Sequence, residues 1–159
     1  MERFTFFWSG PFSQWFKSPF TLEGQAYVTA EQYMMAEKAR LFRDEAIRGQ
    51  ILVTANARQQ KALGRQVQHF DAGRWQAVAR DVVYRGNRAK FTADPGLLAK
   101  LFATRGTTIV EASPDDTIWG IGMAEDDPDV RDRAKWRGSN WLGEVLTQLR
   151  DDLWAERRT

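Results

Sequence analysis

Cysteine is absent from this chain of 159 residues, and histidine occurs once, at His69. Without thiols the protein has no disulfide, no cysteine-ligated zinc and no cysteine nucleophile. A serine–histidine–aspartate site, or a metal centre built on several histidines, would depend on His69 alone, and that residue stands at a predicted helix start where a structural role is expected. We therefore expect neither a metal nor a cofactor.

Long apolar segments and a strong excess of one charge are missing as well. No run approaches the roughly 18 apolar residues of a membrane span, and the start, MERFTFFWSG, lacks the apolar core and cleavage site of a signal peptide. We expect a cytoplasmic protein with no membrane partner. Because 23 Lys and Arg stand against 21 Asp and Glu, binding of nucleic acid through charge alone is not expected, whereas a nucleotide ligand stays open.

Tryptophan, by contrast, is abundant, with seven residues spread along the chain. Large aromatic side chains carry much of the buried area of a core, so most of these rings are expected to be buried or half-buried and one or two to stack on a flat ligand. The length suits one domain with a real core. Since no repeat, low-complexity segment or linker is present, we predict a single domain over residues 1–159.

Hydrophobic periodicity predicts an α+β fold, mostly α, with several helices around a small antiparallel β element. Thr29 followed by Gln32 fits a capping box that starts the first helix at Ala30. The long fourth helix has a predicted apolar face, made of Trp75, Val78, Val82 and Ala89 or Phe91. Helices are predicted over 30–42, 45–53, 55–67, 72–91, 95–103 and from near 140, strands over 4–8 and 107–113, a hairpin over 20–28 and a charge-rich loop over 125–135.

The segment EQYMMAEKARLF places Glu31 and Lys38 on one stripe with Met35 and Phe42, because seven residues span nearly two helical turns. A charged pair in an apolar row either snorkels at the edge of a core or lines a pocket. A lysine taken singly is most often a surface residue. If this face is partly buried, desolvation lowers the pKa of the amine and leaves a lone pair for attack on a carbonyl-type carbon, with Glu31 as proton shuttle.

Two glycine-containing motifs stand near the last helix. WGIG (residues 119–122) places a flat ring beside two glycines, and GSNWLG (residues 138–143) opens the helix with Ser139 or Asn140 as its cap. Asp116, just before the first motif, suits an acid, a base or a group that orients a hydroxyl. Each motif also has a structural interpretation as a tight turn, a helix cap or an aspartate turn, and that use is the more common one.

Five segments, in this order, resemble the NADAR, or YbiA-like, family and cover nearly the whole chain. They are PFS (11–13), TAEQYMMAEKA (29–39), AKF (89–91), LFATRGTTIVEASPDDTIWGIG (101–122) and GSNWLGEVLTQLR (138–150). Each segment is weak alone, whereas the ordered set is specific. The chain departs from the family pattern at Gln14 and Trp15, which replace Asn and Phe near the expected pocket mouth, and at Gln32, which replaces a His that bears on the tuning of Glu31.

The resemblance implies an N-glycosidase that cleaves the ribose C1–N bond of a nucleotide-like substrate. It implies two substrate classes: ADP-ribose attached to guanine, as in a modification made by an ADP-ribosyltransferase toxin, and phosphoribosylamino-pyrimidine intermediates of riboflavin synthesis. In this reading Lys38 attacks the anomeric carbon and forms a Schiff base, while Glu31 and Asp116 handle protons and ribose hydroxyls. The implied substrate-binding residues are Ser13, Gln14, Trp75, Trp119, Gly120, Gly122 and Asn140, although Trp75 is equally expected in the core.

Two other interpretations stay open. In the first, the same pocket is a non-catalytic binding module for ADP-ribose or an NAD-like ligand, and Lys38 stays protonated and pairs with Glu31 or a phosphate. In the second, the chain is an interaction domain whose tryptophans all belong to the core. A phosphate contact is open among Arg105, Lys135 and Arg137.

Overall fold

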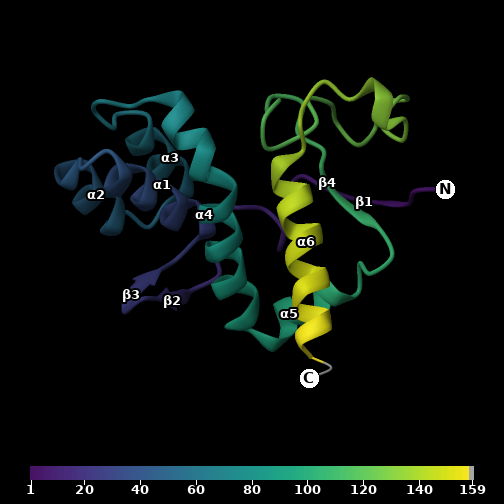
Figure 1. Ribbon diagram of the computed structural model, residues 1–159, viewed down its shortest axis with the longest axis horizontal. Coiled ribbons are helices and arrows are strands. Elements are labelled where there is room, and N and C mark those ends of the chain that lie inside the picture. The colour runs from purple at the N-terminus through teal and green to yellow at the C-terminus, as the bar shows by residue number, and fades with distance from the viewer. Residues whose placement is uncertain (158–159) are drawn as a thin grey trace. The chain divides into compact units, whose positions relative to one another are not determined.

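The structure is a computed structural model that describes residues 1–157. It contains two compact units, which we call the central unit (residues 14–93) and the terminal unit (residues 1–13 and 94–157). The central unit is one continuous stretch of chain inserted between the two segments of the terminal unit (Figure 1). None of the helices within residues 1–157 has both the length and the apolar content of a bilayer span.

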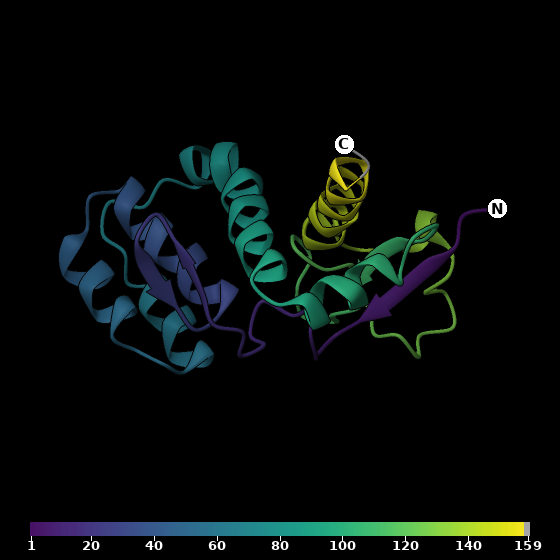
Figure 2. The same cartoon turned by 90° about the horizontal axis from the view of Figure 1, so that it is seen from below.

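The central unit is an antiparallel hairpin with four helices. Its hairpin turns at Glu23 and Gly24, which both have positive φ, and its strands contact helices α1 and α4 (Figure 2). Helix α1 packs against each of the other three helices, and nine of its twelve residues are buried. The elements are β2 (Phe20–Leu22), β3 (Gln25–Tyr27), α1 (Ala30–Leu41), α2 (Glu45–Leu52), α3 (Ala57–Gly64) and α4 (Ala72–Thr92).

A buried polar network fixes the start of α1. The Thr29 hydroxyl accepts a hydrogen bond from the Gln32 amide at 3.0 Å, which confirms the predicted helix start, and donates one to Gln60 Oε1 at 2.6 Å. The Gln32 side chain differs from a capping box because its Oε1 accepts from the Val28 amide at 2.8 Å rather than from the cap residue. Its Nε2 donates to the Ile51 carbonyl at 2.9 Å, so Gln32 ties α1 to the end of α2.

The buried face of α4 differs from the predicted one. Val78 was expected on it and is 36% exposed, because a helical step of 3.6 residues from Trp75 leads past Val78. The buried face also includes two polar residues, Asn87 and Lys90, which are 0% and 1% exposed. The buried positions of the helix are Trp75, Ala79, Val82, Val83, Gly86, Asn87, Lys90 and Phe91.

The terminal unit is built on a pair of parallel strands, β1 (Phe4–Phe7) and β4 (Thr108–Glu111), in the register Phe4 to Thr108. This pairing adds a parallel element to the predicted antiparallel one, while the mostly helical α+β class is confirmed. Helix α6 packs against β4 and contacts α5 (Figure 1). The remaining elements are α5 (Pro95–Phe102), α6 (Trp141–Glu156) and a short 3-10 turn, η1 (Arg133–Lys135), inside the predicted charge-rich loop.

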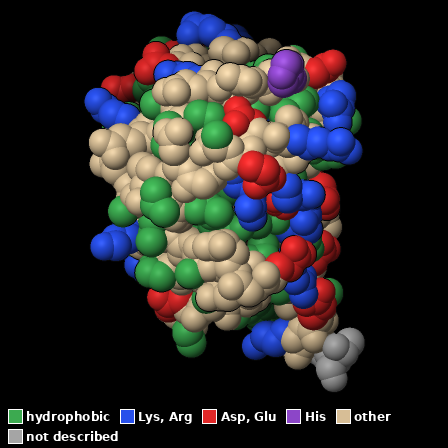
Figure 3. Space-filling model, turned by 90° about the vertical axis from the view of Figure 1, so that its left-hand side faces the viewer, with side chains coloured by type: hydrophobic (Ala, Val, Ile, Leu, Met, Phe, Trp, Pro, Cys, Tyr) green, Lys and Arg blue, Asp and Glu red, His purple; other side chains and the backbone are tan. Residues whose placement is uncertain are grey.

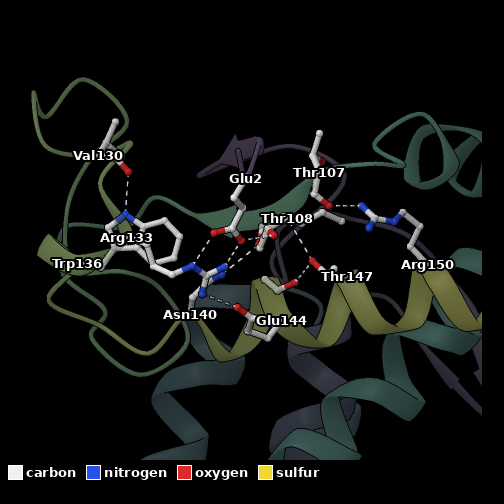
Figure 4. Close-up of polar contacts among 12 residues, drawn as sticks. Glu2, Thr107, Thr108, Val130, Arg133, Trp136, Asn140, Glu144, Thr147 and Arg150 are labelled. Atoms are coloured by element: carbon white, nitrogen blue, oxygen red, sulfur yellow. Dashed lines mark hydrogen bonds and ion pairs between the residues drawn. The ribbon is translucent and has the colours of Figure 1, made fainter.

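Polar side chains of α6 and its flanks bind the backbone of β4 and the segment before it (Figure 4). Thr147 accepts a hydrogen bond from the Ile109 amide at 2.9 Å, and the buried Arg150 guanidinium donates to the Thr107 carbonyl at 2.8 Å. Arg133 pairs with Glu2 and, at 3.2 Å, with Glu144. The first turn of α6 is thereby held close to the strand.

We predict that Gly143→Ala strongly destabilises the protein. A Cβ at Gly143 would lie 2.1 Å from the carbonyl oxygen of Ile109, and this neighbour is strand backbone that cannot turn aside. The expected loss of unfolding free energy is about 1–3 kcal/mol, the usual cost of overpacking. The matched control is Gly49→Ala in α2, where a Cβ meets nothing within 4 Å. Thermal denaturation of the control should show equal or slightly higher stability, and a Gly143→Ala protein as stable as the control would contradict the close approach.

Candidate functional site

Helix α1 carries the two charged residues of the predicted stripe. Glu31, in its first turn, is 5% exposed, and Lys38, two turns later, is half-buried. The Lys38 ammonium lies 4.5 Å from the centroid of the Phe70 ring, and this ring packs edge-on against Phe42 with centroids 5.4 Å apart. Apolar rings therefore lie beside the amine, which the sequence pattern left open between a surface position and a partly buried one.

The surroundings of Lys38 lower the pKa of its amine. Burial is the largest cause, because a low-dielectric environment disfavours the charged form, and the nearby Arg65 guanidinium acts in the same direction. The Glu31 carboxylate opposes them through its charge, which raises the pKa. A larger fraction of this amine is consequently neutral at physiological pH than for a lysine in water, and a neutral amine is a nucleophile.

Gln14 joins α1 to α4 within the central unit. Its carbonyl accepts a hydrogen bond from the Glu31 amide at 2.9 Å, and its Oε1 accepts one from Asn87 Nδ2 at 2.8 Å. Gln14 thus takes a defined structural position next to the predicted carboxylate. Trp75 is 8% exposed on the buried face of α4, as expected of a core residue.

Lys90 is a buried charged residue to which the sequence pattern assigned no role. It is 1% exposed, and burial lowers the pKa of its amine to about 7. The aromatic rings of Phe16 and Phe91 have centroids 5.8 and 4.9 Å from its Nζ. A signal for it was present, since Lys90 stands in the AKF segment.

In the terminal unit, Asp116 organises the WGIG turn. Its Oδ1 accepts hydrogen bonds from the amides of Ile118 and Trp119 at 2.9 and 2.8 Å, and its carbonyl accepts one from Gly122 at 3.1 Å. Gly122 has a φ of +70°, which other residues rarely adopt. These contacts bring Asp116, Trp119 and Gly122 together, in agreement with the structural interpretation of the motif.

Asn140 connects this turn to β4 rather than capping α6 with its side chain. Its backbone amide donates to the Gly120 carbonyl at 3.0 Å. The backbone of Asn140 adopts the left-handed helical conformation, with a φ of 52°. Its side-chain Oδ1 accepts from the Glu111 amide and its Nδ2 donates to the Ile109 carbonyl, both at 3.0 Å. The predicted cap position is therefore confirmed, while the predicted capping contact is wrong because the side chain bonds the strand instead.

Trp119, in the terminal unit, has enough exposed surface to contact a ligand. Trp119 is half-buried and meets Trp141 in an edge-to-face contact with centroids 5.6 Å apart. Ser13, also half-buried, donates its amide to the Gly10 carbonyl at 2.9 Å in a turn. Both residues have surface available, although their described contacts are structural.

Charged side chains of the central unit pair with one another. Glu37 binds Arg40 at 2.5 Å and Arg85 at 3.7 Å, and Arg85 also binds Asp81 at 3.1 Å. On the face drawn in Figure 3, Lys and Arg side chains lie among Asp and Glu side chains rather than in a separate basic patch. This arrangement agrees with the balanced composition and does not favour charge-driven binding of nucleic acid on that face.

The fold is that of a known class of α+β domains. A solved structure of the Escherichia coli protein YbiA superimposes with a TM-score of 0.81 at 29% sequence identity, covering 99% of this chain and 89% of that one. The NADAR domain model matches residues 6–154. The chain therefore belongs to the NADAR family, and the matched stretch includes residues of both units.

Named relatives of this chain include an N-glycosidase and a riboflavin biosynthesis protein. The N-glycosidase R617 of Acanthamoeba polyphaga mimivirus is 43% identical over 146 residues, which are 89% of this chain and 86% of the relative. The chloroplastic riboflavin biosynthesis protein PYRR of Zea mays is 37% identical over 79 residues, which are 50% of this chain and 11% of that protein. Together with the family match, the N-glycosidase name supports a hydrolase of glycosyl bonds.

We predict that Lys38 reacts with an amine-acylating reagent at lower pH than a lysine in water does. Peptide mass mapping of acylated Lys38 against pH gives the midpoint, which should lie below the ordinary value of 10.5. Glu31→Gln should lower the midpoint further, because it removes the charge that raises this pKa. A midpoint that rises or stays unchanged in Glu31→Gln would contradict the coupling of the two groups.

Lys90 predicts a specific pH dependence of stability. Its folded pKa of about 7 lies below the unfolded value of 10.5, so the unfolded state binds more protons between these values and stability increases as pH rises through this window. Lys90→Met should stabilise the protein at about pH 7 and remove a gain of up to about 3 kcal/mol between about pH 7 and pH 9. Urea denaturation of both proteins measures the difference, and parallel pH curves would contradict the buried amine.

Proposed function

We propose that the protein is an N-glycosidase that hydrolyses the ribose C1–N bond of ADP-ribosylated guanine through a Schiff base on Lys38. The main support is the half-buried amine of Lys38, whose pKa is lowered by burial on the helix that also carries the buried carboxylate of Glu31. The N-glycosidase name of the mimiviral relative supports the reaction type. Lysine suits this role because its pKa falls on burial, whereas arginine stays charged.

The reaction balances in three steps. The lone pair of Lys38 Nζ forms a bond to C1, and the electron pair of the C1–N bond leaves with the base nitrogen, which takes up a proton. The nitrogen lone pair then breaks the bond from C1 to the ring oxygen, which is protonated, and a Schiff base forms. Water adds to C1 and expels the lysine amine, giving free ADP-ribose.

Glu31 is proposed to move protons in these steps. Glu31 as a residue is 5% exposed, its backbone amide donates to the Gln14 carbonyl, and its charge acts on Lys38. A carboxylate in such a dry position is suited to take the proton that Lys38 loses on attack and to return it later. The roles of Asp116 on ribose hydroxyls and of Trp119 on the base stay predictions from the family resemblance.

A second substrate class has its own support. The maize relative is named for riboflavin biosynthesis and aligns with half of this chain. Phosphoribosylamino-pyrimidines contain the same ribose C1–N bond, so the same amine and carboxylate serve them without a change of mechanism. We place this class second because that alignment is partial.

We predict that borohydride reduction during turnover of ADP-ribosylated guanosine leaves a stable adduct on Lys38. Mass spectrometry should locate the mass of ADP-ribose on this residue, and Lys38→Arg, which keeps the charge, should lose the adduct and at least about 100-fold in turnover. The matched control is Lys61→Arg, because Lys61 is also half-buried beside an aromatic ring, with its Nζ 5.9 Å from the centroid of Trp15. Full turnover of Lys38→Arg, or an adduct on another lysine, would contradict the Schiff base at Lys38. Binding of ADP-ribose without release of base would favour the non-catalytic module.

A further inference from the structure

We propose that the face of the Phe70 ring is a further catalytic element, which stabilises the positive charge that the reaction places on C1 and on Lys38 Nζ. This assignment rests on the proposed function and deepens it, because it names the group that faces the charge of the Schiff base. In the proposed steps, C1 gains positive charge as its bond to the base breaks, and Nζ carries positive charge in the protonated Schiff base. That charge lasts until water adds to C1.

The contact between the ring and the amine is the first argument. Lys38 Nζ lies over the face of the Phe70 ring, 4.5 Å from its centroid. The face of an aromatic ring carries negative charge density, and a cation within about 6 Å of the centroid is attracted to it. In the proposed function C1 becomes bonded to Nζ, so the charge that develops on these two atoms lies beside the same face of the ring.

The backbone on both sides of this ring is fixed, which is the second argument. Before it, the Gln68 amide donates to Asp44 Oδ2 at 3.0 Å, and His69 has a φ of 60°, a conformation that residues other than glycine seldom adopt. After it, Asp71 caps α4 and accepts a hydrogen bond from the Arg74 amide at 3.0 Å. Backbone strain of this kind is typical of functional sites, because it persists only where the surroundings enforce it.

The exposure of the ring is the third argument. Phe70 meets the buried Phe42 edge-on, with centroids 5.4 Å apart, and is nevertheless 45% exposed. An aromatic ring kept at the surface contributes less to stability than a buried one. A single exposed apolar residue is ordinary, whereas here the exposed ring is also the one that contacts the half-buried amine of Lys38. The ring thus borders the amine and is accessible to a ligand at the same place.

The charged groups that act on the same amine stay in place when only the ring is changed. Glu31, on the same helix, raises the pKa of this amine, and Arg65, at the end of α3, lowers it. Arg74 of α4 lies over the neighbouring ring, with its guanidinium carbon 5.3 Å from the Phe42 centroid. Fluorine atoms on Phe70 weaken the negative face of the ring and change its size little. Fluorination therefore alters the contact with the amine and leaves these three charges unchanged.

The test places monofluoro- and trifluorophenylalanine at position 70 of the full chain. The acylation midpoint of Lys38, measured without substrate, should fall stepwise with the number of fluorine atoms, because the ammonium loses stabilisation. Single-turnover release of guanosine from its ADP-ribosyl adduct should slow stepwise above that midpoint, by about 2-fold to 30-fold for the trifluoro ring. Below the midpoint this effect should shrink, because the ammonium of the free protein loses the same stabilisation.

The matched control makes the same two replacements at Phe16. This ring of the same unit is half-buried and also lies near a lysine, with its centroid 5.8 Å from Lys90 Nζ. Both readings should then stay at wild-type values. A second variant, Phe70→Leu, keeps an apolar side chain and removes the ring. It should slow release at least as much as the trifluoro ring, and faster release would show that the ring only obstructs the amine.

The outcomes separate this assignment from the proposed function. A midpoint that does not follow the number of fluorine atoms overturns the assignment, whether or not base is released. A midpoint that follows it, with release above the midpoint unchanged, shows that the ring acts on the free amine alone and overturns its catalytic role. A wild-type protein that releases no base overturns the proposed function and the catalytic role of the ring together.

Discussion

The burial of helix α1 is the constraint on which the rest of the structure depends. Three helices surround it, and nine of its twelve residues are buried, among them two glutamates and a glutamine. Polar groups in such a position must be satisfied, and the Thr29–Gln32–Gln60 network does this at the start of the helix. The same burial changes the chemistry of Lys38, because an amine held out of water loses its proton more readily.

Local features of this fold could be predicted from the sequence because they depend on short-range contacts. The start of α1 at Ala30, the hairpin turn at Glu23 and Gly24, and the burial of Trp75 follow from caps, turn residues and periodicity. The stripe of Glu31 and Lys38 was also visible, since it needs only the helical step. The pattern left open whether Lys38 is a surface residue or a partly buried one. The structure shows that Lys38 is half-buried on a helix packed against three others.

Features that depend on distant partners could not be predicted in the same way. The parallel pairing of β1 with β4 joins residues about a hundred positions apart, and no local pattern specifies that choice. Asn140 has the sequence position of a cap, yet its side chain binds β4, because the strand lies within its reach. The burial of Lys90 was not predicted for another reason, because the predicted face of α4 was chosen from apolar residues alone and a lysine was left out of it.

The central unit thus contains two amines whose pKa values are lowered by burial and a buried glutamate, Glu31. In water such amines are charged and strongly hydrated, whereas burial disfavours the charged form and lowers the pKa of an amine. Cleavage of a C–N glycosidic bond needs these functions, a nucleophile and groups that take and give protons. The family match and the N-glycosidase relative point to the same bond.

The most direct test of this account is a chromatographic assay of base release by the wild-type protein. ADP-ribosylated guanosine and a phosphoribosylamino-pyrimidine are each incubated with the same preparation, and free base and free sugar are quantified over time. The account predicts release of guanosine together with an equal amount of ADP-ribose, at a higher kcat/KM than for the pyrimidine. Absence of release from both substrates would contradict the glycosidase assignment, and a higher kcat/KM for the pyrimidine would contradict the choice of substrate.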